Sequence, residues 1–536
     1  MKSNRSFLSL VVLLWSLVVA APAGCFAALL SAGANVNISY LTGNQHESTI
    51  SIDPSNPQRM FAAANLEATG NFVACSTNGG ATWNGRIQGA GDGLPSGGGD
   101  VQSAWDRFGN LFLTYIGGNQ SVIVLVSTNG GVTFSNLTAT PFSESSADQP
   151  SIAAGSNSVW VSYASKSNVI VAAGASISGL GAVGSFTQYA VPGSAGGNFG
   201  DIAVGPAGQV LVTYQYDLLN ETQPDKIVVN LNPTGIGGIF GNPVTVATTQ
   251  VGGSHMNIPA QSNNMGIDAE ANLAWDRSGG PHHGRVHLAY TDAPSPSSSA
   301  TDIYTRYSDN NGASWSAPIR VTDDTGSNSK FLPSISVDQT SGAVGVAWYD
   351  CRNDNGQGTN GLPGDTDGIA NNDAQLWATV STNGGASFLP NIQVSAGTSH
   401  AAGSEPPPEG TGYRPLGFGD FNKSDFHAGN FFRVWADNSN STGNNPDGAL
   451  SRFDIYTAAV SVNARLAPLV ELARTATNTV RLSWPAPSTG WALQQNANLN
   501  SANWLGVTNT IRVVGTNNQT IIPTQAGNWF FRLAHP

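Results

Sequence analysis

The sequence predicts an all-β protein in which repeated antiparallel sheets close into a ring, followed by a small β-sandwich. Three observations support this prediction. An eight-residue turn pattern occurs four times, a strand–turn–strand pattern occurs seven times, and the chain combines 63 glycines with only 10% charged residues. An ordinary globular protein has about 25% charged residues, so this composition argues against a coiled coil and against a charge-rich disordered chain.

The chain is acidic, with 22 Lys and Arg against 34 Asp and Glu and a formal net charge of -12. It offers no basic field for the counterion release that drives binding to nucleic acid, so we expect no nucleic-acid partner. Its 536 residues allow two to four domains, because a domain usually has about 100 to 200 residues.

Residues 1–27 are typical of a secretory signal peptide. Lys2 and Arg5 precede an apolar run over residues 7–21, and small residues follow up to the expected cleavage site. The run is shorter than a typical membrane-spanning helix. We therefore expect a secreted protein, extracellular or periplasmic, which is a monomer and has no transmembrane segment in its mature chain. Attachment to the cell envelope through a lipid on Cys25 is the alternative.

The eight-residue pattern first appears at residues 76–83, with the sequence STNGGATW. It predicts a tight structural turn between two strands. Ser and Asn side chains bond to nearby backbone amides, Gly supplies a positive φ, and the closing aromatic ring packs beneath the turn. In the four copies these roles fall to Ser76, Asn78, Gly80 and Trp83; to Ser127, Asn129, Gly131 and Phe134; to Ser308, Asn310, Gly312 and Trp315; and to Ser381, Asn383, Gly385 and Phe388.

The strand–turn–strand pattern also marks units that lack this turn. The wide interval between the second and third copies of the turn holds two of them. The last unit ends at residues 456–462 without an outer strand, which residues 35–39 would supply, and such a pairing would protect the edges of the ring. The units begin at Ser51–Pro54, Ala104–Arg107, Ile152–Gly155, Ile202–Gly205, Leu273–Asp276, Ile335–Asp338 and Gly419–Asn422.

The turn pattern, Ser-x-Asp/Asn-x-Gly-x-Ser/Thr-Trp/Phe, resembles the Asp-box, or bacterial neuraminidase repeat. Over residues 34–463 the chain is therefore similar to the sialidase-like β-propeller proteins. The resemblance implies a β-propeller, for which the unit count favours seven blades, with the six blades of sialidases as the alternative. The motif is specific for a blade turn and says little about catalysis, because it also occurs in propellers that are not enzymes.

Residues 464–536 are expected to form a separate accessory domain. Short strand-like runs, such as those over residues 480–485 and 529–533, predict a small β-sandwich. Its tryptophans either bind carbohydrate or fill the core.

Candidate catalytic residues come from long loops that we place on one rim of the ring. Asp292, Asp350 and Asp437 each follow an aromatic-bearing strand. Either each Asp ends its strand by bonding to the following backbone, or the three form part of a carboxylate ring around the central channel. A carboxylate pair drawn from these residues or from Glu409 would suit the acid and base steps of a glycoside hydrolase.

The sialidase resemblance implies three substrate-binding arginines, the first in an Arg-Ile-Pro motif, and a tyrosine nucleophile. Tyr413 and Arg414 lie on the expected rim, but the chain contains no Arg-Ile-Pro. Because function is argued from the site and not from the fold, sialidase catalysis is not carried over to this chain.

The loop over residues 350–373 is rich in oxygen ligands. Ca²⁺ takes six to eight oxygens, which clustered Asp and Asn on a glycine-rich loop can supply, although such loops also occur without a metal. The candidate ligands are Asp354, Asp365, Asp367 and Asp373.

Taken together, the sequence favours a secreted, sialidase-like propeller that binds a glycan or another cell-surface polymer on its acidic rim, and it leaves open whether this propeller is catalytic. The alternatives are an exo-acting glycoside hydrolase and a structural or adhesion protein of the envelope.

Overall fold

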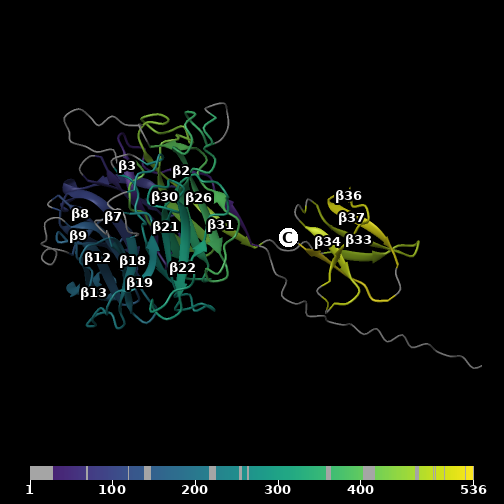
Figure 1. The fold of residues 1–536 in the computed structure, drawn as a ribbon, viewed down its shortest axis with the longest axis horizontal. Coiled ribbons are helices and arrows are strands. Elements are labelled where there is room, and N and C mark those ends of the chain that lie inside the picture. The colour runs from purple at the N-terminus through teal and green to yellow at the C-terminus, as the bar shows by residue number, and fades with distance from the viewer. Residues whose placement is uncertain are drawn as a thin grey trace, which may run out of the picture. The chain divides into compact units, whose positions relative to one another are not determined.

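The computed structural model describes residues 28–67, 70–118, 120–137, 147–216, 225–252, 256–261, 265–357, 364–401, 417–464, 470–486, 488, 491–499, 501, 503–524 and 527–534. The predicted signal peptide with Cys25, and the candidate residues Glu409, Tyr413 and Arg414, lie outside these ranges. Residues Leu30–Asn463 form one compact unit, and Ala464–Pro536 belong to a second (Figure 1). The described residues contain one short helical turn, η1 (Ala90–Asp92), and no apolar helix of membrane-spanning length.

The described residues of the larger unit form seven antiparallel sheets, and in six of them the first four strands neighbour one another in chain order. These strands are β3 (Gln45–Ile52), β4 (Met60–Leu66), β5 (Asn71–Ser76) and β6 (Asn84–Gln88); β7 (Gly97–Trp105), β8 (Leu111–Gly117), β9 (Val122–Ser127) and β10 (Ser135–Asn136); β11 (Asp148–Ala154), β12 (Ser158–Ala164), β13 (Ile170–Gly179) and β14 (Ala182–Val183), with β15 (Thr187–Ala190); β16 (Gly197–Val204), β17 (Val210–Tyr216), β18 (Asp225–Asn232) and β19 (Val244–Thr249); β20 (Asn272–Trp275), β21 (Val286–Asp292), β22 (Asp302–Ser308) and β23 (Ile319–Arg320); and β24 (Lys330–Val337), β25 (Val344–Asp350), β26 (Asp373–Ser381) and β27 (Ile392–Gln393), with β28 (Ser399–His400).

The seventh sheet joins the two ends of this unit. It contains β29 (Ser424–His427), β30 (Asn430–Asp437) and β31 (Asp454–Ala464), and both β1 (Ala28–Ala32) and β2 (Val36–Asn37) pair with β31. The expected pairing of residues 35–39 is confirmed at β2, where Val36 lies opposite Thr457. The sequence did not predict β1.

The innermost strands contact one another in a closed succession: β3, β7, β11, β16, β20, β24, β29 and again β3. Apolar side chains fill the space between neighbouring sheets, as with Val124 of β9 and Val161 of β12. The predicted all-β propeller is therefore confirmed.

A buried carboxylate fastens the closure. Asp454 accepts hydrogen bonds from Asn37 Nδ2 (2.5 Å) and Ser39 Oγ (3.1 Å), so the N-terminal segment is tied to the first residue of β31. Burial raises the pKa of Asp454 to about 6, although these two hydrogen bonds act in the opposite direction.

The four repeated turns share one geometry. In the first, Ser76 Oγ accepts from Gly80 N (3.0 Å), Asn78 Oδ1 accepts from Thr82 N (2.9 Å), and Trp83 Nε1 donates to Gly80 O (3.0 Å). The Ser and Asn bonds recur in the other three turns at 2.9 to 3.0 Å. The repeat in the sequence is thus a repeat of hydrogen bonds, in which each polar side chain closes its own turn.

The glycine of each turn also faces the preceding sheet. Gly131 has a φ of 89°, and a Cβ built on it would lie 2.7 Å from the ring of Phe61 and 2.9 Å from Cys75 Sγ. Gly80, Gly312 and Gly385 likewise have a positive φ and closest neighbours on the preceding sheet. The turns therefore hold neighbouring sheets close together, which only glycine permits.

The smaller unit has two sheets around a small core. One contains β32 (Glu471–Arg474), β33 (Thr479–Pro485), β37 (Asn517–Pro523) and β36 (Arg512–Val514), and the other contains β35 (Leu505–Gly506), β34 (Ala492–Asn496) and β38 (Phe530–Ala534). Trp484 is buried in this core with Leu482, Leu493 and Ile522. Trp504 lies beneath the guanidinium of Arg532, 4.2 Å from it. Carbohydrate binding by the tryptophans of this unit stays a prediction.

Replacing Gly131 with Ala should lower the free energy of unfolding by about 2 to 4 kcal/mol, because it adds backbone strain at positive φ to overpacking against Phe61. Urea denaturation checks this. Gly91→Ala is the control, since a Cβ at the exposed Gly91 meets nothing within 4 Å, and it should change stability by less than about 0.5 kcal/mol. Equal effects of the two substitutions would contradict the packing role.

Candidate functional site

The innermost strands share an irregularity close to where they begin. β3, β7, β11, β16 and β24 each shift register against their second strand, as at a β-bulge. In six sheets a non-glycine residue with positive φ occupies the same position, five residues before the end of the innermost strand. These residues are Glu47 (φ 51), Asp100 (φ 53), Gln149 (φ 46), Phe199 (φ 51), Glu270 (φ 49) and Leu332 (φ 53).

Three of these residues and Asp420 form a buried acid cluster. The carboxyl groups of Asp100 and Asp420 share hydrogen bonds with Glu47, and Glu270 interacts electrostatically with all three. Because the four residues belong to different sheets of the ring, they can meet only near its axis. We call Glu47, Asp100, Glu270 and Asp420 the acid cluster.

Amide groups connect the acid cluster to its surroundings. Asn65 Nδ2 donates to Glu47 Oε2, Gln149 N donates to Asp100 Oδ2 (2.9 Å), and Gln149 Nε2 donates to Asp420 Oδ2 (3.2 Å). Glu47, Glu270 and Asp420 are buried, but Asp100 is half-buried and the neighbouring Asp148 is exposed. Asp100 and Asp148 therefore bring the cluster to the solvent.

The four carboxyl groups differ in protonation. Burial raises the pKa of Asp100, Asp420 and Glu270 well above the usual range, and repulsion from Glu47 adds to this. Burial also acts to raise the pKa of Glu47, but its interactions with His46, Asp100 and Asp420 outweigh burial and lower it. Like charges so close do not ionise together, so Glu47 ionises before its neighbours as pH rises. The cluster thus offers hydrogen-bond donors and acceptors side by side.

The carboxylates predicted from the sequence have local partners instead. Ala293 N donates to Asp292 Oδ1 (2.8 Å), Arg352 N to Asp350 Oδ1 (2.8 Å) and Ser439 N to Asp437 Oδ1 (2.7 Å). Asp350 and Asp437 also each accept from the indole of a Trp two residues earlier. These are the bonds expected if each Asp only ends its strand by accepting from the backbone that follows. The structure does not place the three residues in the acid cluster.

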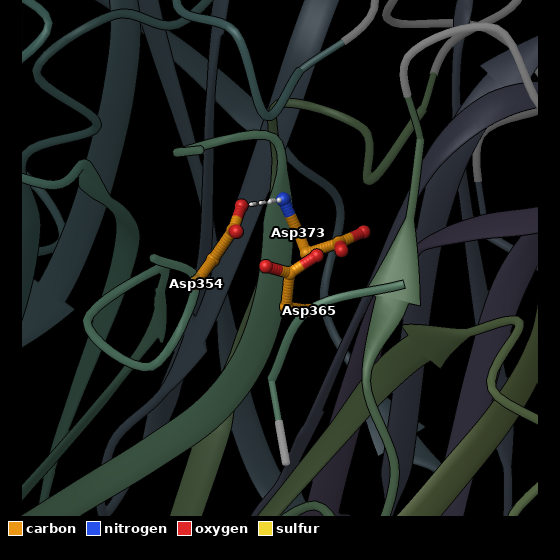
Figure 2. A group of neighbouring side chains, drawn as sticks. All are labelled: Asp354, Asp365 and Asp373. Atoms are coloured by element: carbon orange, nitrogen blue, oxygen red, sulfur yellow. Dashed lines mark hydrogen bonds between the residues drawn. The ribbon is translucent and has the colours of Figure 1, made fainter. Parts of the chain in front are cut away.

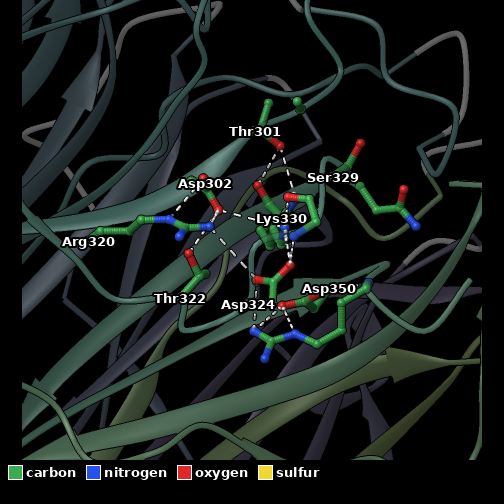
Figure 3. Close-up of polar contacts among 12 residues, drawn as sticks. Thr301, Asp302, Arg320, Thr322, Asp324, Ser329, Lys330 and Asp350 are labelled. Atoms are coloured by element: carbon green, nitrogen blue, oxygen red, sulfur yellow. Dashed lines mark hydrogen bonds and ion pairs between the residues drawn. The ribbon is translucent and has the colours of Figure 1, made fainter.

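Asp350 also belongs to an ion network between two sheets (Figure 3). Arg352 Nη2 lies 2.7 Å from Asp350 Oδ2, and Arg352 Nη1 lies 2.7 Å from Asp323 Oδ1. The fully buried Lys330 donates to Asp324 Oδ2 (2.9 Å). Burial raises the pKa of Asp350, and Arg352 opposes this rise. The charge of Asp350 is thus compensated within the network.

Three of the four predicted metal ligands lie together (Figure 2). Asp354, Asp365 and Asp373 are buried, and each offers a carboxylate oxygen within 4.8 Å of the others. Asp354 Oδ2 accepts from Asp373 N (2.9 Å). Asp367 is outside this group; its carboxylate accepts from Asn372 Nδ2 (2.9 Å). The donors are all oxygens, which fits a hard cation such as Ca²⁺ and not zinc or copper.

Sequence reasoning missed the acid cluster. A signal was present, since Glu47, Asp100 and Glu270 occupy the same position in three units, five residues before the innermost strand ends. Comparing the units position by position would have found it.

No protein-family model and no curated protein matches the chain. Solved structures give distant likenesses. A protein of unknown function from Dyadobacter fermentans is 8% identical with a TM-score of 0.41, covering 81% of this chain and 99% of its own. An α-L-arabinanase from Penicillium chrysogenum, complexed with arabinobiose, is 12% identical with a TM-score of 0.40, covering 66% and 98%.

A Hadza microbial sialidase is 13% identical with a TM-score of 0.37, covering 57% of this chain and 63% of its own. At these identities and TM-scores, the likenesses assign neither a family nor an activity to the chain.

Glu270→Gln should make stability less dependent on pH. Because the pKa of Glu270 is raised in the folded state, its neutral form stabilises the fold at low pH, and this contribution is lost as pH rises through the folded pKa. Gln has no proton to lose, so the variant should gain stability relative to wild type between about pH 5 and about pH 8. Urea denaturation at both pH values measures the difference, and exposed Glu471→Gln is the control. A constant difference would contradict the protonated state.

Proposed function

We propose that this chain is a secreted Asp-box propeller that binds a glycan at the acid cluster without cleaving it. The observation that carries the proposal is the acid cluster near the ring axis, where a carboxyl group of lowered pKa lies beside three of raised pKa. Sugar hydroxyls both donate and accept hydrogen bonds, so they match such a cluster. The hydrogen bonds of the four repeated turns support the Asp-box assignment.

The spacing of the carboxyl groups favours binding over hydrolysis. Glycoside hydrolases place their two carboxyl groups at least about 5 Å apart so that they flank the scissile bond. Glu47 instead interacts with Asp100 and Asp420 at hydrogen-bonding range, which differs from that flanking arrangement. The absence of an Arg-Ile-Pro motif argues in the same direction against a sialidase.

Glycan-array binding of purified residues 28–536, followed by calorimetry with the best glycan, tests the binding proposal. Asp148→Ala and Asp100→Asn should each weaken affinity at least about tenfold, because each removes a carboxyl group from the solvent-facing side of the cluster. Asp92→Ala is the matched control: it removes a partly exposed carboxylate that pairs with Arg86 on the same unit. Binding that is unchanged in both variants would move the glycan site elsewhere.

The same preparation should release no sialic acid from sialyllactose and no reducing sugar from the bound glycan. Release that Asp100→Asn abolishes would overturn the non-catalytic proposal and favour a glycoside hydrolase.

We further propose that Asp354, Asp365 and Asp373 hold Ca²⁺ and so stabilise their loop. Three buried carboxylates repel one another unless a cation or protons compensate them. The neighbouring Asn372 has a buried side-chain oxygen without a hydrogen-bond partner among the described residues, which is a further oxygen donor in this loop.

Adding Ca²⁺ at a hundred times its Kd should raise the free energy of unfolding by about 2.7 kcal/mol, and chelation should reverse this. Thermal unfolding with Ca²⁺ and with EGTA measures the shift. Asp365→Asn should reduce it, whereas exposed Asp309→Asn should not. An unchanged Ca²⁺-dependent shift in the unfolding of Asp365→Asn would mean that the cation binds elsewhere.

A further inference from the structure

The ring encloses a cavity at the end opposite the acid cluster. Its volume is about 400 Å³, which is within the size range of small-molecule pockets. In six sheets its walls are the last three residues of the innermost strand, such as Ser103–Trp105 and Ile335–Val337, and in the seventh they are residues 423–427. The acid cluster lies about 10 Å further along the strands, at about 3.3 Å per residue.

The mouth of this cavity is on the face that carries the repeated turns. Pro54, Arg277 and Thr340 line it, and each belongs to a turn between a first and a second strand. These turns are at the same end as the repeated turns, since Gly79 N donates to Gln58 O (3.0 Å). The cavity is therefore separate from the rim at which we place the glycan.

Arg277 supplies a positive charge at the mouth. Its Nη1 donates to Ala154 O (2.9 Å). Its electrostatic partner is Asp425, which lines the same cavity and accepts from the backbone of Ile52 (2.7 Å) and Phe426 (2.8 Å). Lys423, which also lines the wall, donates to Asp201. Arg277 is therefore the cation of the wall that forms no ion pair within 4.0 Å among the described residues.

We propose that this cavity binds a small organic anion with an apolar body. The anionic group meets Arg277 at the mouth, and the apolar part lies among the Ile, Val, Leu and Ala side chains of the strand ends. This is a second ligand site, independent of the glycan site.

Arg107 offers a matched control for Arg277. Each follows an Asp at the start of the turn between the first and second strands of its sheet. Arg107 lies between β7 and β8, and Arg277 lies between β20 and β21. The guanidinium of Arg107, however, donates to Ser156 O (2.9 Å) and Asn157 Oδ1 (2.8 Å), and Arg107 does not line the cavity. Replacing each with Gln removes the same charge from equivalent turns.

Calorimetry of residues 28–536 with octanoate, and with 1-octanol as its neutral analogue, tests the proposal. We expect octanoate to bind, Arg277→Gln to weaken it at least about tenfold and Arg107→Gln to leave it unchanged. Octanol should bind both Arg variants equally. Ala153→Phe fills the cavity and should abolish octanoate binding while the glycan still binds. This variant tests the proposal even if Arg277→Gln fails to fold. No octanoate binding, or equal binding by Arg277→Gln, would overturn the proposal.

Discussion

Closure of the ring is the constraint on which the rest of the structure depends. An open row of sheets would leave hydrogen-bonding edges at both ends, and this chain removes them by pairing β1 and β2 with β31. Asn37 and Ser39 then anchor the closure on Asp454. With the ends joined, the innermost strands surround one axis, and residues far apart in the chain become neighbours there.

The two ends of that axis differ in their chemistry, although the same repeated innermost strands surround both ends. Where the innermost strands begin, the register shifts and residues with positive φ, such as Glu47 and Asp100, surround the acid cluster. Where these strands end, mainly apolar side chains surround the cavity beside Arg277. The repeated turns hold the sheets close enough for both sites to form, because their glycines pack against the preceding sheet.

The sequence predicted the fold well because its signals are local. Apolar alternation and the Ser-Asn-Gly turns depend on residues a few positions apart, and even the closing strand at Val36 could be inferred by counting strands. The acid cluster depends on contacts between different sheets, which no local pattern contains. Asp350 and Asp437 stood out because each follows a Trp closely, and the structure gives a local reason, since each accepts from that indole. The candidate metal ligands Asp354, Asp365 and Asp373 could be grouped from the sequence because they share one loop region.

The central claim is that Glu47 is ionised beside protonated Asp100, Asp420 and Glu270, because this mixture creates the donors and acceptors of the site. Infrared spectroscopy tests it most directly, since the C=O stretch of a carboxylic acid is distinct from that of a carboxylate. The account predicts a carboxylic-acid band that persists in the folded protein at neutral pH and weakens when Asp420 is replaced by Asn. A folded protein without this band at neutral pH would contradict the account.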